Sequence, residues 1–233
     1  MNWTAVSNDD FIVIVSGSSG SGNGEVVYHV AANTGAAIRS GAITVAGLTY
    51  NVLQGVDFLD VPASHPAYAE IGKLSAQGIV FGFGGRTFRP DEPTTRSQAA
   101  GLLAKALGEL EPPPPARQRF ADVSPDHPAF VSIDLLAERN ILPPEQSEFF
   151  HPDEPVTQGQ VAALIIRALG ELAPPSPLRQ RFPDVLPANP YASYIERMAA
   201  LGITEIKDGD LYRPDAPVTR SQMAALLVRA FNL

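Results

Sequence analysis

Threonine and glutamine side chains stand three residues apart at three places in this sequence, a spacing that suits hydrogen bonding at a helix start. The first pair is Thr95 and Gln98. An N-cap threonine accepts a hydrogen bond from the backbone amide three residues on, and a glutamine there reaches back to the amide of the threonine. The equivalent pairs are Thr157 with Gln160 and Thr219 with Gln222. We therefore expect three helices that begin with the same capping box.

Residues that could perform catalysis form no recognisable constellation. The chain has no cysteine and four histidines, two of which, His65 and His127, precede predicted helices at equivalent positions. Side-chain capping explains such histidines without a metal. Asp208 and Asp210 flank a glycine, but a calcium loop needs a downstream bidentate glutamate, so a turn is the better interpretation. We predict that the protein is not an enzyme and holds no metal or cofactor.

The elements that position these residues recur every 62 residues. A Phe-x-Asp-Val motif begins at Phe58, Phe120 and Phe182. A fixed period over three units is typical of repeat architectures, in which no unit buries its apolar face alone. Behind each capping box, apolar residues follow at the i, i+3, i+4, i+7, i+8 spacing of an amphipathic helix. They are Ala99, Leu102, Leu103, Ala106 and Leu107; Val161, Leu164, Ile165, Ala168 and Leu169; Met223, Leu226, Leu227, Ala230 and Phe231.

Each repeat also contains an earlier helix, expected to end at Gly78, Asn140 or Gly202. Glycine and asparagine tolerate the left-handed conformation of a C-terminal cap. Proline-rich linkers over 108–120 and 170–182 suit stiff spacers between repeats. The pattern predicts repeats over residues 56–111, 112–173 and 174–233, whose second helices bury their stripes against one another.

Composition narrows the class of partner. A hydrophobic content of 45% supports a folded core, and a net charge of −8 argues against nucleic acid and anionic membranes. No apolar run reaches the ~18 residues of a membrane span. No signal peptide follows Met1, so if the protein is exported, we expect this sequence to be part of a longer precursor.

The first 55 residues differ in kind from the rest. Segments 11–15, 25–30, 42–45 and 48–53 are typical of short strands. The Ser/Gly-rich segment 16–24 is expected to be a flexible turn or loop, and Ala46-Gly47 a tight hairpin turn. Residues 1–55 are therefore predicted to form a small all-β sandwich.

Several motifs in this segment resemble the BACON domain, an immunoglobulin-like β-sandwich. They lie at residues 3–8, 19–24, 31–33, 39–45 and 52–54. The resemblance covers the later part of the family's pattern and implies that the first strand or two, ahead of Trp3, are missing. It leaves a carbohydrate-binding role and a spacer role open. A truncated sandwich is also expected to expose an unpaired strand edge, covered by another chain or by the repeats.

Residues 58–233 resemble three S-layer homology repeats. The resemblance rests on Phe-x-Asp-Val, a helix ending in Gly-Ile, the Phe/Tyr-Arg-Pro-Asp-x-Pro segment and Thr-Arg-Ser-Gln, which corresponds to the family's Thr-Arg-Ala-Glu. It implies a pseudo-threefold unit with a central bundle of second helices and grooves between repeats. The expected fold is mixed and multidomain: a partial immunoglobulin-like all-β sandwich followed by a mostly α pseudo-threefold trimer of helix-loop-helix repeats.

The same resemblance implies which residues would bind a ligand. The family's motif arginine, which contacts an acidic sugar, corresponds to Arg96 and Arg220, while the second repeat carries Gln158. A guanidinium pairs with a carboxylate in bidentate fashion. The alternative is that both arginines are exposed first-turn residues, bridged to a nearby aspartate. The candidate ligand-binding residues are Arg96, Arg220, Gln158, Asp60, Asp122 and Asp184.

From the resemblance we expect an extracellular, non-catalytic module that anchors a protein to the bacterial envelope. Its partner would be cell-wall polysaccharide, or a peptidoglycan-linked polymer, held in grooves between repeats. Two alternatives stay open. The protein could be a structural subunit of an extracellular sheet or filament that self-associates through the open sandwich edge, or both segments could be appendages of an exported hydrolase.

Overall fold

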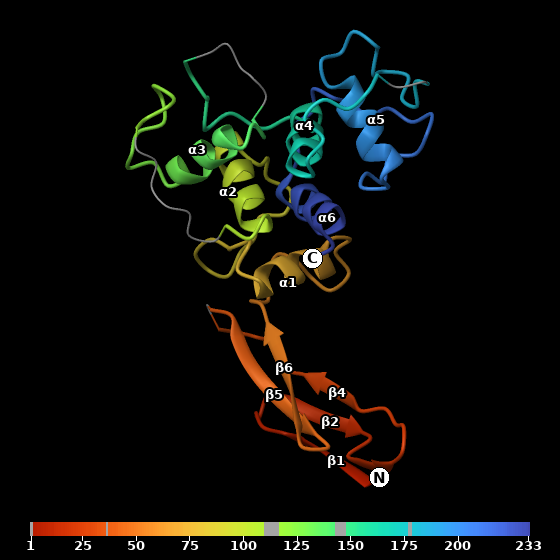
Figure 1. Ribbon diagram of the computed structural model, residues 1–233. Helices are drawn as coiled ribbons and strands as arrows, with labels where there is room; N and C mark the ends of the chain where they lie inside the picture. Colours follow the sequence, from red (N-terminus) through yellow and green to blue (C-terminus); the bar gives the residue numbers. More distant parts are fainter. Residues whose placement is uncertain (1, 36, 110–116, 143–147, 177–178) are drawn as a thin grey trace. The chain divides into compact units, whose positions relative to one another are not determined.

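A computed structural model describes residues 2–35, 37–109, 117–142, 148–176 and 179–233 (Figure 1). The chain divides into two compact units, residues 1–88 and 89–233, here called the N-terminal and C-terminal units. The division falls inside the first repeat, whose first helix lies in the N-terminal unit and whose second helix lies in the C-terminal unit. The middle of the first proline-rich linker and part of the second lie outside the described residues.

The strands of the N-terminal unit form two antiparallel sheets, which confirms the predicted all-β class of this segment (Figure 1). Ala46 and Gly47 both have positive φ, 53° and 81°, so the predicted tight turn is also confirmed. The larger sheet has the order β3-β1-β5-β6, with β1 (Asn2–Ser7), β3 (Ser19–Ser21), β5 (Arg39–Val45) and β6 (Leu48–Gln54). The smaller sheet pairs β2 (Ile12–Ser16) with β4 (Val27–Val30).

The Ser/Gly-rich segment is only in part the turn or loop that its composition suggested, because Ser19–Ser21 form β3. Gly20 pairs with Trp3, and a Cβ on Gly20 would lie 2.4 Å from the indole ring. A Cβ on Gly24 would lie 2.2 Å from the same ring, and Trp3 Nε1 donates to the carbonyl of Gly22 at 3.0 Å. The glycines therefore make room for the indole ring of Trp3.

The first helices of the repeats are α1 (Tyr68–Ala76), α3 (Phe130–Glu138) and α5 (Ala192–Ala200). Their predicted ends are confirmed, since Gly78, Asn140 and Gly202 have φ of 70°, 55° and 69°. These helices begin later in the chain than expected from capping by His65 and His127. His65 Nδ1 accepts a hydrogen bond from the amide of Ala67 at 3.1 Å, so the histidine caps a turn ahead of the helix. The equivalent bonds run from Ala129 to His127 and from Tyr191 to Asn189.

The second helices are α2 (Arg96–Ala106), α4 (Gln158–Ala168) and α6 (Arg220–Phe231), and each has the predicted capping box. Their buried face includes much of the predicted stripe but is broader, because it also contains the i+1 and i+5 positions. The reason is that α2 and α4 also pack against α3 and α5, the first helices of the next repeats. The buried apolar residues of these helices are Ala99, Ala100, Leu103 and Ala104; Val161, Ala162, Ala163, Leu164, Ile165 and Ile166; Met223, Ala224, Leu227, Val228 and Ala230.

A ring of backbone hydrogen bonds joins the three loops that precede these helices. The amide of Thr94 donates to the carbonyl of Val218 at 2.8 Å, Val218 donates to Val156 at 3.0 Å, and Val156 donates to Thr94 at 2.9 Å. The three residues occupy equivalent positions and are buried. The loops therefore close around a common axis, as expected for a pseudo-threefold unit.

Replacement of Thr94 by valine is expected to stabilise the protein. Within the described part of the chain, the buried Oγ1 of Thr94 has no hydrogen-bond partner, whereas the other two repeats have valine at this position. An unsatisfied buried hydroxyl costs about 1–3 kcal/mol, so Thr94→Val should raise the free energy of unfolding by about 1 kcal/mol or more in urea denaturation. The matched control, Val156→Thr, should lower it. A loss of stability in Thr94→Val would contradict this explanation.

Candidate functional site

The three candidate aspartates hold the loop that leads into each second helix. Asp122 accepts backbone hydrogen bonds on both carboxylate oxygens, from Phe150 at 2.8 Å and from His151 at 2.7 Å. His151 has φ of 57°, so the carboxylate secures a left-handed turn. In the other repeats, Asp60 accepts from Phe88, and Asp184 from Tyr212 and Arg213.

The protonation of Asp122 is coupled to stability through these bonds. Partial burial alone would raise the pKa of Asp122, but the backbone N–H groups of Phe150, His151 and Asp122 and the charge of His151 outweigh it and hold the pKa below its usual value. A depressed folded-state pKa contributes stability above the unfolded-state pKa, and that stability is lost as the pH falls through the folded-state value.

Asp122→Asn is expected to remove this acid-sensitive contribution. The amide group keeps one acceptor but places an NH2 against a backbone N–H, which should cost about 1–3 kcal/mol at pH 7. The difference in free energy of unfolding from the parent should shrink as the pH falls below ~4, the ordinary aspartate range. Urea denaturation at pH 7, 4 and 3 measures it. A constant difference over this range would exclude Asp122 as the titrating group.

The groove between repeats 1 and 2 is nearly filled by the side chain of Arg96. Its Nε donates to the carbonyl of Phe150 at 2.7 Å, and its Cζ lies 4.8 Å from the centroid of the Phe150 ring, within cation–π range. The remaining space has a volume of about 20 Å³ and is also lined by Leu142, Gln160 and Leu164. The arginine is therefore fixed against the wall of the next repeat.

The equivalent groove between repeats 2 and 3 is more open, because Gln158 stands in place of the arginine. Its volume is about 160 Å³. The hydroxyl of Tyr212 donates to the backbone carbonyl of Gln158 at 3.5 Å, and burial raises the pKa of Tyr212, so the phenol stays neutral. Arg229 and Glu205, which form an ion pair, also line this groove. The two grooves therefore differ in size and in the origin of their positive charge.

Arg220 lies at the start of α6, equivalent to Arg96 and Gln158. It is 8% exposed, and its backbone amide donates to the carbonyl of Glu92 at 2.9 Å. An exposed first-turn residue, the alternative explanation, therefore does not describe Arg220. The structure places Arg96 and Gln158 in equivalent grooves, whereas Asp122 and Asp184 are not among the described residues that line either one.

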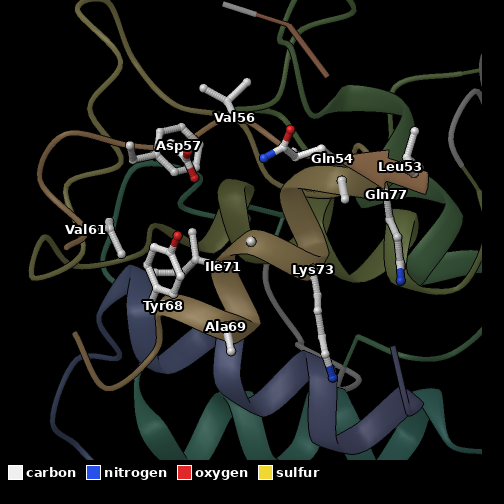
Figure 2. Close-up of a pocket in the computed structure, with 14 residues that line it drawn as sticks. Leu53, Gln54, Val56, Asp57, Val61, Tyr68, Ala69, Ile71, Lys73 and Gln77 are labelled. Carbon is white, nitrogen blue, oxygen red and sulfur yellow. The ribbon is translucent and has the colours of Figure 1, made fainter. Parts of the chain in front are cut away.

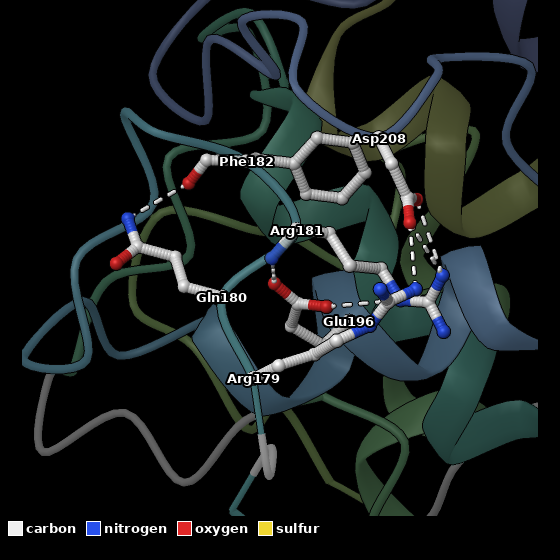
Figure 3. Close-up of polar contacts among 6 residues, drawn as sticks. All are labelled: Arg179, Gln180, Arg181, Phe182, Glu196 and Asp208. Carbon is white, nitrogen blue, oxygen red and sulfur yellow. Dashed lines mark hydrogen bonds and ion pairs between the residues drawn. The ribbon is translucent and has the colours of Figure 1, made fainter.

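Three arginines ahead of the second and third Phe-x-Asp-Val motifs, Arg119, Arg179 and Arg181, form local ion pairs. The amide of Arg181 donates to Glu196 Oε1 at 2.7 Å, and its Nε lies 3.2 Å from Glu196 Oε2 (Figure 3). The corresponding pair in repeat 2 joins Arg119 Nε to Asp134 Oδ1 at 2.9 Å. Both acidic residues are buried, so these pairs belong to the packing of the repeats.

Asp208, in the loop considered for calcium, also belongs to this network. Its carboxylate accepts from Arg179 at 2.7 Å and lies 3.1 Å from Nη1 of Arg181, and Gly209 turns the chain with φ of 94° (Figure 3). The turn interpretation is therefore supported. The described ranges contain no group of three or more potential metal ligands, and none of their helices is long and apolar enough to cross a membrane.

Comparison with known proteins gives the family and the location. The family model of the S-layer homology domain matches residues 57–100, 119–162 and 181–224, more than half of the chain. The cellulosome-anchoring protein of Acetivibrio thermocellus is 26% identical over 65% of this chain and 35% of its own length. The outer membrane protein SlpA of Thermus thermophilus is 36% identical over 45% of this chain and 11% of its own. The surface-layer 125 kDa protein of Lysinibacillus sphaericus is 27% identical over 88% of this chain and 17% of its own.

The chain thus spans about a third or less of the length of these relatives. Some further relatives have enzyme names, an amylopullulanase and an endoglucanase among them. The family and the anchoring and surface-layer relatives indicate an extracellular, cell-surface location and support a role in anchoring there. The matched segments coincide with the three capped repeats described above, and the chain belongs to the S-layer homology family.

Proposed function

We propose that this chain attaches a larger protein to the cell envelope by binding cell-wall polysaccharide in the grooves between its repeats, without catalysis. The observation that carries the proposal is the pair of equivalent grooves in the C-terminal unit, each lined by an arginine, Arg96 in one and Arg229 in the other. A guanidinium held in place by protein contacts pairs well with an acidic sugar, because little further ordering is needed on binding.

The two grooves are expected to contribute unequally. Arg96 is committed to the Phe150 wall through its Nε bond and its stacking, so ligand would meet only the outer edge of the guanidinium. The groove beside Gln158 has room for a substituent of a sugar ring, with the neutral phenol of Tyr212 in its wall. A carboxylate entering it would compete with Glu205 for Arg229.

Binding to purified sacculi that retain their polysaccharide tests the proposal. The parent protein should co-sediment with sacculi, and Arg96→Ala/Arg220→Ala/Arg229→Ala should lose most of this binding. Arg117→Ala is the matched control, since Arg117 is exposed and lies outside the two grooves. The proposal would be contradicted if the parent protein did not bind sacculi, or if the parent and the triple variant bound them equally.

A specific observation favours a second function, self-association through the β unit. In the larger sheet, β6 is hydrogen-bonded on one side by β5 and ends the strand order, and its apolar Leu48, Tyr50 and Leu53 are exposed. Such an edge is a template for pairing with another chain. Light scattering should then show a mass that grows with concentration, and Asn51→Lys on the edge should suppress the growth. A constant monomer mass would leave the β unit as a spacer.

A further inference from the structure

The N-terminal unit contains a cavity of about 540 Å³ between the end of β6 and helix α1 (Figure 2). This volume lies in the range of ligand pockets. The carboxylate of Asp57 and the ring of Tyr68 line it, together with the apolar side chains of Phe58, Val61 and Ile71. Its residues are separate from those of the two grooves between repeats.

Comparison of the repeats explains why the cavity is open. Asp57 and Gly72 of repeat 1 occupy the positions of Arg181 and Glu196 in repeat 3, the buried ion pair of Figure 3. Repeat 1 therefore lacks both partners, and a Cβ on Gly72 would meet no atom within 4 Å. The matching groove of repeat 3 is smaller, about 380 Å³, and its lining includes Arg179, Arg181 and Arg197.

The cavity instead displays an aromatic ring beside a carboxylate. Tyr68 is 39% exposed, whereas its counterpart Phe130 is 7% exposed. The hydroxyl of Tyr68 points toward Asp57, and the charge of Asp57, together with burial, raises the pKa of Tyr68 (Figure 2). The backbone carbonyl of Asp57 accepts from Arg86 Nη2 at 2.9 Å, which fixes the acidic residue in place.

We propose that this cavity is a second saccharide site, one that takes a neutral N-acetylated pyranose unit of the wall polymer. A sugar ring can lie against the exposed face of Tyr68, whose polar edge remains hydrated or hydrogen-bonded. The carboxylate of Asp57 accepts from a ring hydroxyl or from the acetamido N–H, a charge-assisted bond. The acetyl methyl group packs on Val56, an apolar lining residue that is half-buried and so keeps some accessible surface.

The site and the grooves would select different units of a polymer. Lys73 also lines the cavity, but its side chain leads away from Asp57 and Tyr68 (Figure 2). The charge beside the ring of Tyr68 is therefore that of Asp57, which repels an acidic sugar, whereas the arginines of the grooves attract one. The proposal rests on the proposed function, since it assigns a second contact to the same kind of polymer. The cavity differs from the two grooves in its location, in the charge of the sugar that it prefers and in the residues that a variant must change.

Titration of the ¹⁵N-labelled full chain with a tetramer of N-acetylglucosamine, and separately with a tetramer of galacturonic acid, tests the site. The neutral tetramer should shift the amide signals of Tyr68, Ile71 and Gly72, and the acidic tetramer should leave them unchanged. Tyr68→Ala should weaken binding at least tenfold. Phe149→Ala is the matched control, since Phe149 is an exposed aromatic residue that lines neither the cavity nor the two grooves, and its loss should leave these shifts unchanged.

The residues of repeat 3 suggest the variant that tests the cavity most specifically. Asp57→Arg/Gly72→Glu restores the residue pair of repeat 3 and places side chains in the cavity, so it should abolish the shifts while the melting temperature stays the same or rises. Unchanged signals with the neutral tetramer, or equal binding of both tetramers, would overturn the inference. If the protein binds sacculi but the neutral tetramer does not shift the amide signals of the cavity, this site alone is rejected. Cavity binding without any sacculus binding would reject the anchoring function.

Discussion

Ile166→Ala is expected to lower the free energy of unfolding by about 2–5 kcal/mol, the cost of removing a fully buried isoleucine side chain down to its Cβ. Ile166 lies on α4 and is 0% exposed. The backbone around it is held at both ends, by the capping box of Thr157 and by the amide of Glu171, which donates to the carbonyl of Ile166. Local collapse into the cavity is therefore limited, which favours the upper half of that range.

The matched control is Leu169→Ala in the same helix. Leu169 belongs to the stripe that the sequence predicted, but it is 38% exposed at the end of α4. Its truncation should cost less than about 1 kcal/mol, as is usual for side chains at the surface. Urea denaturation of both variants measures the difference. If Leu169→Ala were the more damaging change, the end of the predicted stripe would belong to the packing surface after all.

This contrast shows how far the sequence could predict the fold. The helix period and the capping boxes placed α2, α4 and α6 correctly, because both signals are local. The additional width of the buried face, at residues such as Ala162 and Ile166, was not predictable from one helix. It arises because α2 and α4 each pack against the first helix of the next repeat as well as toward the axis, a contact between residues far apart in sequence.

Local composition misled the prediction in the β unit for a related reason. Serine and glycine are typical of loops, and segment 16–24 was predicted to be one. Gly20 and Gly24 instead leave the space that the indole ring of Trp3 occupies. The pairing of Trp3 with Gly20, which lies 17 residues further along the chain, is a contact that local composition does not reveal.

The candidate site was predicted unevenly. Equivalence of Arg96 and Gln158 follows from the period, and the structure places both in matching grooves. The aspartates are equivalent too, but both carboxylate oxygens of Asp122 accept hydrogen bonds from backbone amides of the loop. Arg229 could not have been chosen from the motif, since it lies in the last turn of α6. A ligand role for any of these residues stays a prediction until binding is measured.

Loss of Arg181 alone is expected to be nearly as damaging as loss of a core side chain. Glu196 is 7% exposed, and Arg181 Nε lies 3.2 Å from its Oε2. In Arg181→Met, Glu196 would keep its hydrogen bond from the backbone amide of residue 181 but lose the guanidinium. An uncompensated buried charge typically costs about 3–5 kcal/mol of stability. Because the arginine is a quarter exposed and water can reach its place, we expect about 3 kcal/mol by urea denaturation.

The double variant Arg181→Met/Glu196→Leu separates the cost of an orphaned charge from the worth of the pair. Replacing both partners by apolar residues removes the buried charge, so the double variant should recover most of the stability lost by Arg181→Met. Arg119→Met and Arg119→Met/Asp134→Leu repeat the experiment in the second repeat, where the acidic residue is also buried. If each double variant is as unstable as its single one, the guanidinium contributes through packing or through Asp208 instead. The unpaired positions Asp57 and Gly72 of repeat 1 would then need another explanation.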